Sequence, residues 1–298
     1  MPMLSSATTM PSATTLLRPP DELARGDFEL VVRRLADDLA FGMDASRFVG
    51  SGLEYAQSRP YAPGDPVKMM DWRITARLGK PFVKEYDSPK RTSVFIVVDT
   101  SASMGVSSTA LTKHDLAVWI AAAIGLLAQR RMSPVGVIGG GEREILLNPS
   151  LNRGDLWQAL DPLRAVSLKE GTRLAARLSD LDVHARRSSI FVIISDLHDP
   201  DALAALRHAA QKHDCMAIHL LDPAERGRLR AGFFRGREAE SGRTFLAHGR
   251  SVWDRPSVVA SDLAGCGVSY LRLQTDLAFM APLRHFLSNR PAMGGGRG

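Results

Sequence analysis

The chain has 298 residues, and 45% of them are hydrophobic, which is enough to build the core of one large domain with an accessory segment. Its 38 basic and 32 acidic residues give a net charge of +6, an excess too small and too evenly spread to indicate nucleic-acid binding by itself. The longest apolar run, residues 116–128, is too short to span a bilayer.

The two ends of the chain differ in composition from the rest. Residues 1–20 are rich in Ser, Thr and Pro without the apolar core of a signal peptide, so we expect a disordered leader. Residues 291–298 are glycine-rich and predict a flexible tail. The two cysteines, Cys215 and Cys266, lie far apart in the sequence, and we interpret them as unpaired core thiols in a reducing compartment. The sequence therefore indicates a soluble cytoplasmic protein.

Residues 21–90 form the first structured region. Apolar residues at helical spacing predict an amphipathic helix within residues 21–43. Residues 47–87 then concentrate aromatic side chains and arginines, with a turn at residues 63–66 and a strand at 81–86. We expect this second segment, the arm, to pack on the main domain with Trp72 as an anchor in the core. The sequence does not indicate the role of the arm.

Residues 91–290 form the main domain, in which strands alternate with helices. The expected strands are residues 93–98, 134–138, 144–147, 188–194, 215–221 and 268–273. The expected helices are residues 111–131, 151–163, 171–181, 201–213, 256–266 and 277–287. Residues 225–248 predict a peripheral hairpin. The alternation predicts an α/β fold with a doubly wound, mostly parallel sheet and a minor antiparallel edge near residues 136–147.

Oxygen-bearing side chains follow the predicted strands. Asp99, Ser101 and Ser103 stand at alternate positions after the first strand, Asp196 follows the strand 188–194, and Thr172 stands near a helix start. The loops at the carboxyl ends of neighbouring parallel strands meet at one edge of a sheet. Two carboxylates and three hydroxyls are hard ligands that suit Mg²⁺ or Mn²⁺, with one aspartate binding through water. A remaining coordination position would accept water or a carboxylate from another protein.

This set of five residues resembles the metal-ion-dependent adhesion site (MIDAS) of von Willebrand factor type A domains. The resemblance implies a sheet of the von Willebrand factor A or Rossmann-like type with the arm packed on it. It also implies a bound metal ion that joins the protein to a partner.

The arm resembles a second, bacterial family, known as domain of unknown function fifty-eight. The motif R-P-Y-A-P-G-D-P-V-K-M-M-D-W, residues 59–72, carries the resemblance, with Lys68 and Met70 where the family usually has arginine and isoleucine. Later matches are L-L-D-P-A-E at 220–225, T-D at 275–276 and F-L-x-x-R at 286–290, whereas Glu170 replaces a frequent glycine. The resemblance implies a non-enzymatic partner of MoxR-type AAA+ ATPases that acts in assembly or maturation of other proteins.

Two other functions stay open. A Mg²⁺-dependent phosphohydrolase of the haloacid-dehalogenase type also places an aspartate after its first strand, but its acid–base residue two positions later is here Ser101. His198 could serve as a base, although a surface loop histidine is the preferred interpretation. A nucleic-acid-binding protein is favoured only by a cluster of five arginines, Arg226, Arg228, Arg230, Arg235 and Arg237.

Overall fold

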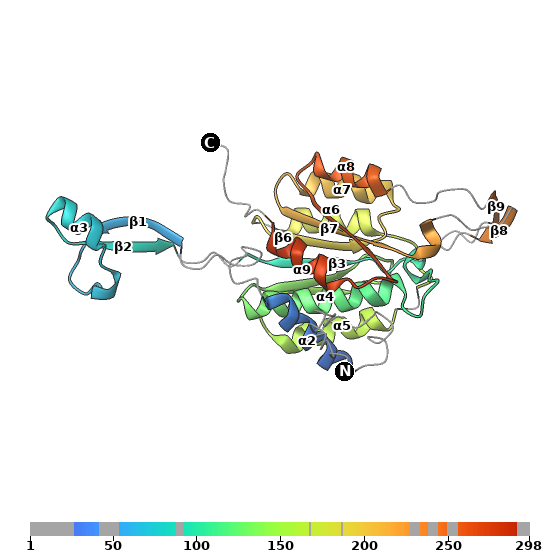
Figure 1. Ribbon diagram of the computed structural model, residues 1–298, viewed down its shortest axis with the longest axis horizontal. Helices are drawn as coiled ribbons and strands as arrows, with labels where there is room; N and C mark the ends of the chain where they lie inside the picture. The colour runs from blue at the N-terminus through green and yellow to red at the C-terminus, as the bar shows by residue number, and fades with distance from the viewer. Residues whose placement is uncertain are drawn as a thin grey trace, which may run out of the picture.

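The computed structural model describes residues 27–41, 54–87, 92–166, 168–185, 187–226, 233–237, 244–248 and 256–290. At its centre lies a six-stranded sheet with the order β10–β7–β6–β3–β4–β5 (Figure 1). The strands are β3 (Val94–Val98), β4 (Val135–Gly139), β5 (Leu146–Ser150), β6 (Ile190–Ser195), β7 (Asp214–Leu221) and β10 (Ser269–Gln274). All neighbours pair in parallel except β4 and β5. The predicted mixed α/β fold with an antiparallel edge is therefore confirmed.

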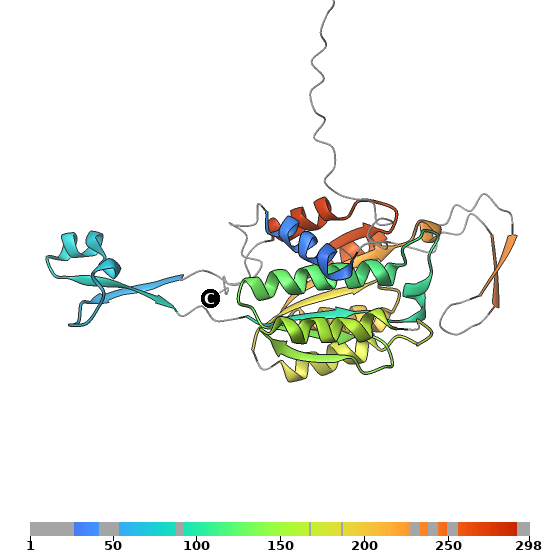
Figure 2. The same cartoon turned by 90° about the horizontal axis from the view of Figure 1, so that it is seen from below.

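Helices cover both faces of the sheet (Figures 1 and 2). One face packs against α2 (Phe28–Ala40), α4 (Lys113–Arg130), α5 (Arg153–Arg164) and α9 (Met280–Ser288). The other face packs against α6 (Leu174–His184), α7 (Pro200–Ala209) and α8 (Pro256–Ala264). Because helices cover both faces, β4 and β6 are buried along their whole length. Strands in this position must be apolar on both sides.

The direction in which strands are added reverses in the middle of the sheet. From β3 the chain adds β4 and β5 on one side, and it then returns to add β6, β7 and β10 on the other side. The loops after β3 and β6 consequently leave in different directions, and ligand sites in open α/β sheets lie at this point. The register places Val98 beside Ile194, and the Asp99 amide donates to the Ile194 carbonyl at 3.0 Å.

Helix α4 is the central helix of its face, and its first turn carries two polar residues into the interior. Thr112 and Asp115 form a capping box at its first turn, so the helix begins at a fixed position. Residues 116–128 are buried around the whole circumference, which accounts for their apolar character. Lys113 and His114 in the first turn are also buried. Among the helices in the described ranges, none is both long and apolar enough to cross a membrane.

The arm has a small fold of its own, which corrects the expectation that it packs on the domain. It consists of the antiparallel pair β1 (Glu54–Pro60) and β2 (Phe82–Asp87) with the 3₁₀ turn η1 (Val67–Met69) and helix α3 (Trp72–Leu78). Figures 1 and 2 show the arm standing away from the central sheet.

The anchor role expected for Trp72 is wrong for a physical reason. Trp72 is 64% exposed, whereas Val83 is the only apolar side chain described in the arm that is fully buried. Polar contacts hold the arm together instead. Asp71 caps α3 and accepts a hydrogen bond from Ser58 at 2.7 Å. A unit this small has too little interior to enclose an indole ring.

Several predictions concern residues outside the central sheet. Strands β8 (Phe233–Arg237) and β9 (Thr244–His248) form the expected peripheral hairpin. Cys215 is a buried free thiol in β7, and burial raises its pKa to about 12. Cys266 is exposed, against expectation, because α8 ends at Ala264 and Cys266 lies in the following turn. The predicted leader, residues 1–20, and tail, residues 291–298, lie outside the described residues.

Candidate functional site

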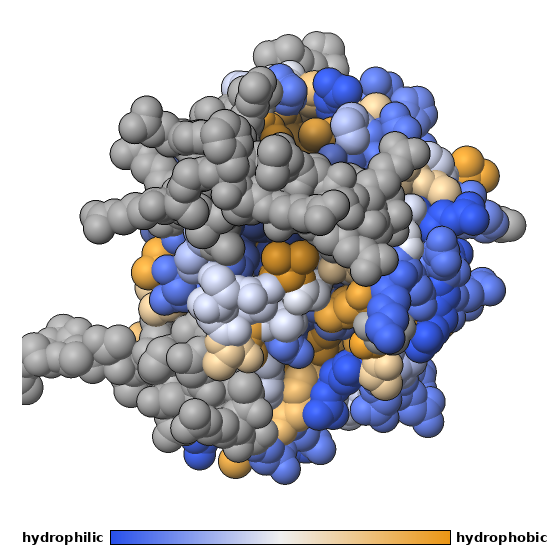
Figure 3. Space-filling view, turned by 90° about the vertical axis from the view of Figure 1, so that its right-hand side faces the viewer, coloured by the Kyte–Doolittle hydropathy of each residue, from blue (hydrophilic) through white to orange (hydrophobic). Residues whose placement is uncertain are grey.

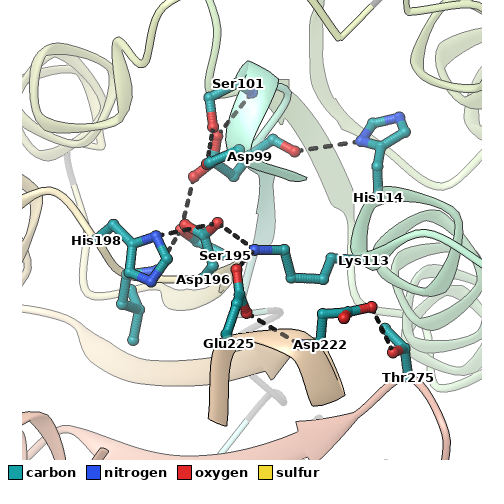
Figure 4. A network of polar contacts seen from close by, with 12 residues as sticks. Asp99, Ser101, Lys113, His114, Ser195, Asp196, His198, Asp222, Glu225 and Thr275 are labelled. Carbon is teal, nitrogen blue, oxygen red and sulfur yellow. Dashed lines mark hydrogen bonds and ion pairs between the residues drawn. The ribbon is translucent and has the colours of Figure 1, made fainter. Parts of the chain in front are cut away.

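The loops after β3 and β6 bring four of the five predicted ligands together, and Figure 4 shows three of them, Asp99, Ser101 and Asp196. Asp99 follows β3 directly, and its Oδ1 accepts a hydrogen bond from the Ser101 amide at 2.9 Å. The hydroxyls of Ser101 and Ser103 lie 3.0 Å apart. Asp196 follows β6 and shares a hydrogen bond with the Ser103 side chain. The predicted juxtaposition of the Asp99 loop with Asp196 is therefore present.

The fifth predicted ligand, Thr172, approaches on the loop before α6. The Ala102 amide donates to the Glu170 carbonyl at 2.9 Å, and a β-bridge joins Ser101 to Glu170. This pairing places the 170–172 loop beside the Asp99 loop. The Thr172 hydroxyl accepts a hydrogen bond from the amide of Leu174, the first residue of α6, at 3.3 Å. In the described part of the chain, no hydrogen bond links Thr172 to the other four side chains.

Asp99 is a buried carboxylate beside another carboxylate. Its side chain accepts hydrogen bonds from Ser101 and, at 2.6 Å, from the Ser195 hydroxyl. Burial and then the negative charge of Asp196 raise the pKa of Asp99, and the hydrogen bonds offset this only in part. Within the described ranges no basic side chain lies within ion-pair distance of Asp99. Ionisation of Asp99 is therefore unfavourable in these surroundings.

Lys113 lies at the centre of a buried ion-pair cluster that the sequence analysis missed. Its Nζ lies 2.8 Å from Asp196 Oδ2 and also contacts Glu225, while the side chain is 0% exposed. Burial opposes its charge, but the carboxylates of Asp196 and Glu225 outweigh this and raise the pKa of Lys113. Burial likewise opposes ionisation of Asp196, yet Lys113 keeps the pKa of Asp196 below its usual value.

Glu225 and Asp222 connect this cluster to the end of β7. Glu225 lies in the 3₁₀ turn η3 (Pro223–Arg226), and its Oε2 accepts a hydrogen bond from the Asp222 amide at 2.9 Å. The buried Asp222 carboxylate in turn accepts from the Ser108 amide at 2.8 Å and from Thr275 at 3.3 Å. The loop after β3, the start of α4 and the end of β7 are thus tied together through side chains.

Three histidines border the cluster. His198 is a loop histidine with a 43% exposed side chain, as preferred from the sequence, but its Nδ1 lies 3.5 Å from Asp196 Oδ2. His114 is buried and its ring nitrogens face the carbonyls of Asp99 and Leu163. His219 is buried next to Tyr270, and burial lowers its pKa to about 4, so the ring is neutral at physiological pH.

Comparisons with known proteins place the chain in a family. The profile of a family described as "Protein of unknown function DUF58" matches residues 57–255, which includes most of the arm. The chain belongs to the DUF58 family. It is 30% identical to uncharacterized proteins of Mycobacterium tuberculosis and Mycobacterium bovis, over 95% of its own length and 97% of theirs.

A distant structural match adds no argument about this DUF58 protein. The crystal structure of the Deinococcus radiodurans RO (RSR) protein matches with a TM-score of 0.35 and 19% identity. The match covers 92% of this chain and half of that one.

The residues of this DUF58 site fit a divalent cation. Asp99, Asp196 and Glu225 supply three carboxyl groups against the single ammonium of Lys113, which gives an excess of two negative charges when all three are ionised. The hydroxyls of Ser101 and Ser103 add neutral oxygen donors. Such a donor set is typical of Mg²⁺ or Mn²⁺ sites. Asp196, His198 and Glu225 also have ligand atoms within 4.8 Å of one another, but the ammonium of Lys113 already contacts two of these side chains.

The structure bears on only one of the two alternative functions, the phosphohydrolase. The arginine cluster that favoured nucleic-acid binding lies outside the described residues or on described backbone whose side chains are not described. The position two residues after Asp99 is a serine that contacts Ser103, and the nearest carboxylate, Asp196, is paired with Lys113.

Proposed function

We propose that this DUF58 protein is a non-enzymatic, metal-dependent protein-binding module of the von Willebrand factor A-like kind. Ser101, Ser103 and Thr172 would supply hydroxyl ligands, and Asp99 and Asp196 the compensating charge. The bound Mg²⁺ or Mn²⁺ would accept a carboxylate from a partner at its open coordination position. The single observation that carries the proposal is the buried pair of Asp99 and Asp196, of which only Asp196 has a basic partner among the described residues.

The surroundings of the pair support binding rather than chemistry. A general acid or base must be free to exchange a proton with a substrate. Here Asp196 is fixed by Lys113 and kept ionised, while both oxygens of Asp99 accept hydrogen bonds from Ser101 and Ser195. A cation held this way presents a positive charge to a partner without a neighbouring group that activates water.

The position of the site in the molecule and the strand order also agree with the proposal. The loops after β3 and β7 lie at one end of the molecule, opposite the arm in Figures 1 and 2. In Figure 3, which looks onto that end, pale and apolar residues lie between strongly hydrophilic ones. The strand order, with the site at the point where it reverses, is compatible with the von Willebrand factor A-like resemblance.

The partner follows from the metal and from the family resemblance. An ion with one open position selects a carboxylate, so the contacted residue is an aspartate or glutamate. The proposed partner is a cytoplasmic MoxR-type AAA+ ATPase, with a role in assembly or maturation of other proteins.

A binding measurement with purified components tests this proposal. We expect a MoxR-type ATPase immobilised on a sensor surface to retain the chain in Mg²⁺ and to release it in chelator. The variant Ser101→Ala should weaken binding at least tenfold, because a ligand hydroxyl is lost with little change in volume. Glu142→Ala, which removes an exposed acid outside the cluster, serves as the matched control. Retention that is equal with and without chelator would contradict the role of the metal, and Mg²⁺-dependent hydrolysis of a phosphate ester that Asp99→Asn abolishes would favour the phosphohydrolase.

A further inference from the structure

The arm carries unbalanced positive charge at its far end. Its acids with described side chains are all engaged. Asp65 pairs with Arg59 at 2.7 Å, and Glu85 accepts a hydrogen bond from Gln57 at 2.8 Å. Asp71 accepts from the first-turn amides of α3 as well as from Ser58.

The basic residues of the same region have no such partners. Four exposed basic residues within residues 68–80 have no ion-pair partner among the described residues: Lys68, Arg73, Arg77 and Lys80. Residues 61–80 contain these four basic residues and two acidic ones, Asp65 and Asp71, so the net charge of the segment is +2. A surface of this kind attracts an anionic partner.

Large apolar side chains lie among these cations. Val67 is 68% exposed, Trp72 is 64% exposed and Leu78 is 56% exposed, while Tyr61 is exposed to a smaller degree. We call residues 61–80, which contain η1 and α3, the arm tip. In Figure 1 the arm tip is the end of the arm farthest from the central sheet. Exposed apolar residues that gather within one short segment mark an interaction surface.

The shape of the arm tip indicates the kind of surface that it contacts. Val67 lies on η1, whereas Trp72 and Leu78 lie on α3 about 120° apart around the helix axis, given 3.6 residues per turn. These two exposed side chains therefore lie on one broad side of the short helix. A fluid bilayer interface can take up such side chains without a preformed recess, which a folded protein would need. Tryptophan also has a particular preference for the membrane–water interface.

We propose that the arm tip binds the surface of an anionic lipid bilayer, with Trp72 inserted at the headgroup level and the four basic residues against lipid phosphates. The contact is peripheral and uses the full chain. It does not involve the metal site, which lies at the other end of the molecule in Figures 1 and 2. A protein bound in this way would keep its metal site directed toward the aqueous phase.

Flotation of the full chain with lipid vesicles tests the proposal. We expect binding to phosphatidylglycerol vesicles at low ionic strength, little binding to phosphatidylcholine vesicles, and release as salt increases. The double variant Arg73→Gln/Arg77→Gln should reduce partitioning roughly 25-fold, since each basic residue near an anionic surface contributes about fivefold. Trp72→Ala should also reduce binding. The chain has four tryptophans, so the blue shift of tryptophan fluorescence that we expect on vesicle binding should be present in the parent and absent in Trp72→Ala.

Matched controls keep these outcomes decisive. Val183→Ala removes an apolar residue that is 77% exposed on α6, and Arg187→Gln removes an exposed charge on the main domain, so neither should change binding. The substituted arm residues are exposed, so circular dichroism should show unchanged folding. Equal binding by Arg73→Gln/Arg77→Gln and the parent would overturn the proposal. So would binding to poly-glutamate but not to phosphatidylglycerol, which would assign the arm tip to an acidic protein instead.

Discussion

The variant Lys113→Met is expected to unfold more easily than the parent by about 3–5 kcal/mol, the cost typical of breaking a buried ion pair. Methionine nearly fills the volume of the lysine side chain, so the packing loss is small. The change nevertheless leaves Asp196, and Glu225 beside it, buried without their cation. Urea unfolding in the presence of chelator measures the difference in the free energy of unfolding.

A surface ion pair provides the control for this variant. Arg130 lies in the same helix and pairs with Asp37, whose side chain is 67% exposed, so Arg130→Met should cost less than about 1 kcal/mol. The effect of Lys113→Met should also shrink on acidification. The pKa of Asp196 is lowered in the folded protein, so its contribution is present at neutral pH and is lost as the pH falls through that lowered value. Equal stability of Lys113→Met and the parent at neutral pH would show that the pair is not buried as described.

The effect of the substitution Asp99→Asn on the stability of the folded protein is expected to change sign when a metal ion binds. In chelator at neutral pH the variant should be more stable than the parent, because burial and the charge of Asp196 raise the pKa of Asp99 above its unfolded value of about 3.9. Between about pH 4 and this raised pKa, the folded parent keeps a proton on Asp99 that the unfolded chain releases, so the parent loses stability as the pH rises through this interval. Asparagine lacks this charge, so the advantage of the variant should grow over the same range.

In Mg²⁺ the order of the two proteins should reverse. A ligand that binds only the folded state at 100 times its dissociation constant adds about 2.7 kcal/mol of stability. The parent gains this contribution, and Asp99→Asn gains little of it because the amide has no charge to offer the ion. Thermal unfolding of both proteins, with Mg²⁺ and with chelator, checks the reversal. A variant that is less stable than the parent in chelator would show that Asp99 is not strained by its neighbour.

Local sequence predicted the fold well because the central strands of the sheet are short runs of apolar residues. The run at β3 is apolar at every position and the run at β6 at every position but the last, Ser195, and such segments are stable between two layers of helices. Once both are strands of one parallel sheet, Asp99 and Asp196 must lie at the same edge. The position of four predicted ligands followed from this topology alone.

The polar cluster behind the ligands could not be predicted in the same way. Lys113 stands in the first turn of α4, between Thr112 and Asp115, where an exposed lysine is the ordinary expectation. Its burial depends on Glu225, which is 112 residues away in the sequence. The L-L-D-P-A-E motif, which contains Glu225, carries part of the family resemblance, but no local signal in the sequence pairs Glu225 with Lys113.

The prediction for Trp72 fails in the opposite direction, because a side chain that is expected to be buried is exposed. Tryptophan is usually well buried, and this preference predicted a core anchor. The preference depends on a core large enough to receive the ring. The arm consists of two strands and one short helix with a single fully buried apolar residue, so its contacts are mainly polar and the ring stays outside.

Calorimetric titration of the chain with Mg²⁺ and with Mn²⁺ tests the central claim most directly. The parent should bind one ion per chain. Asp99→Ala and Asp196→Ala should each lose affinity by on the order of 100-fold, and Glu142→Ala should match the parent. If Asp99→Ala and Asp196→Ala bind the ions as tightly as the parent does, the metal is not held between the loops after β3 and β6, and the proposed binding function falls with it.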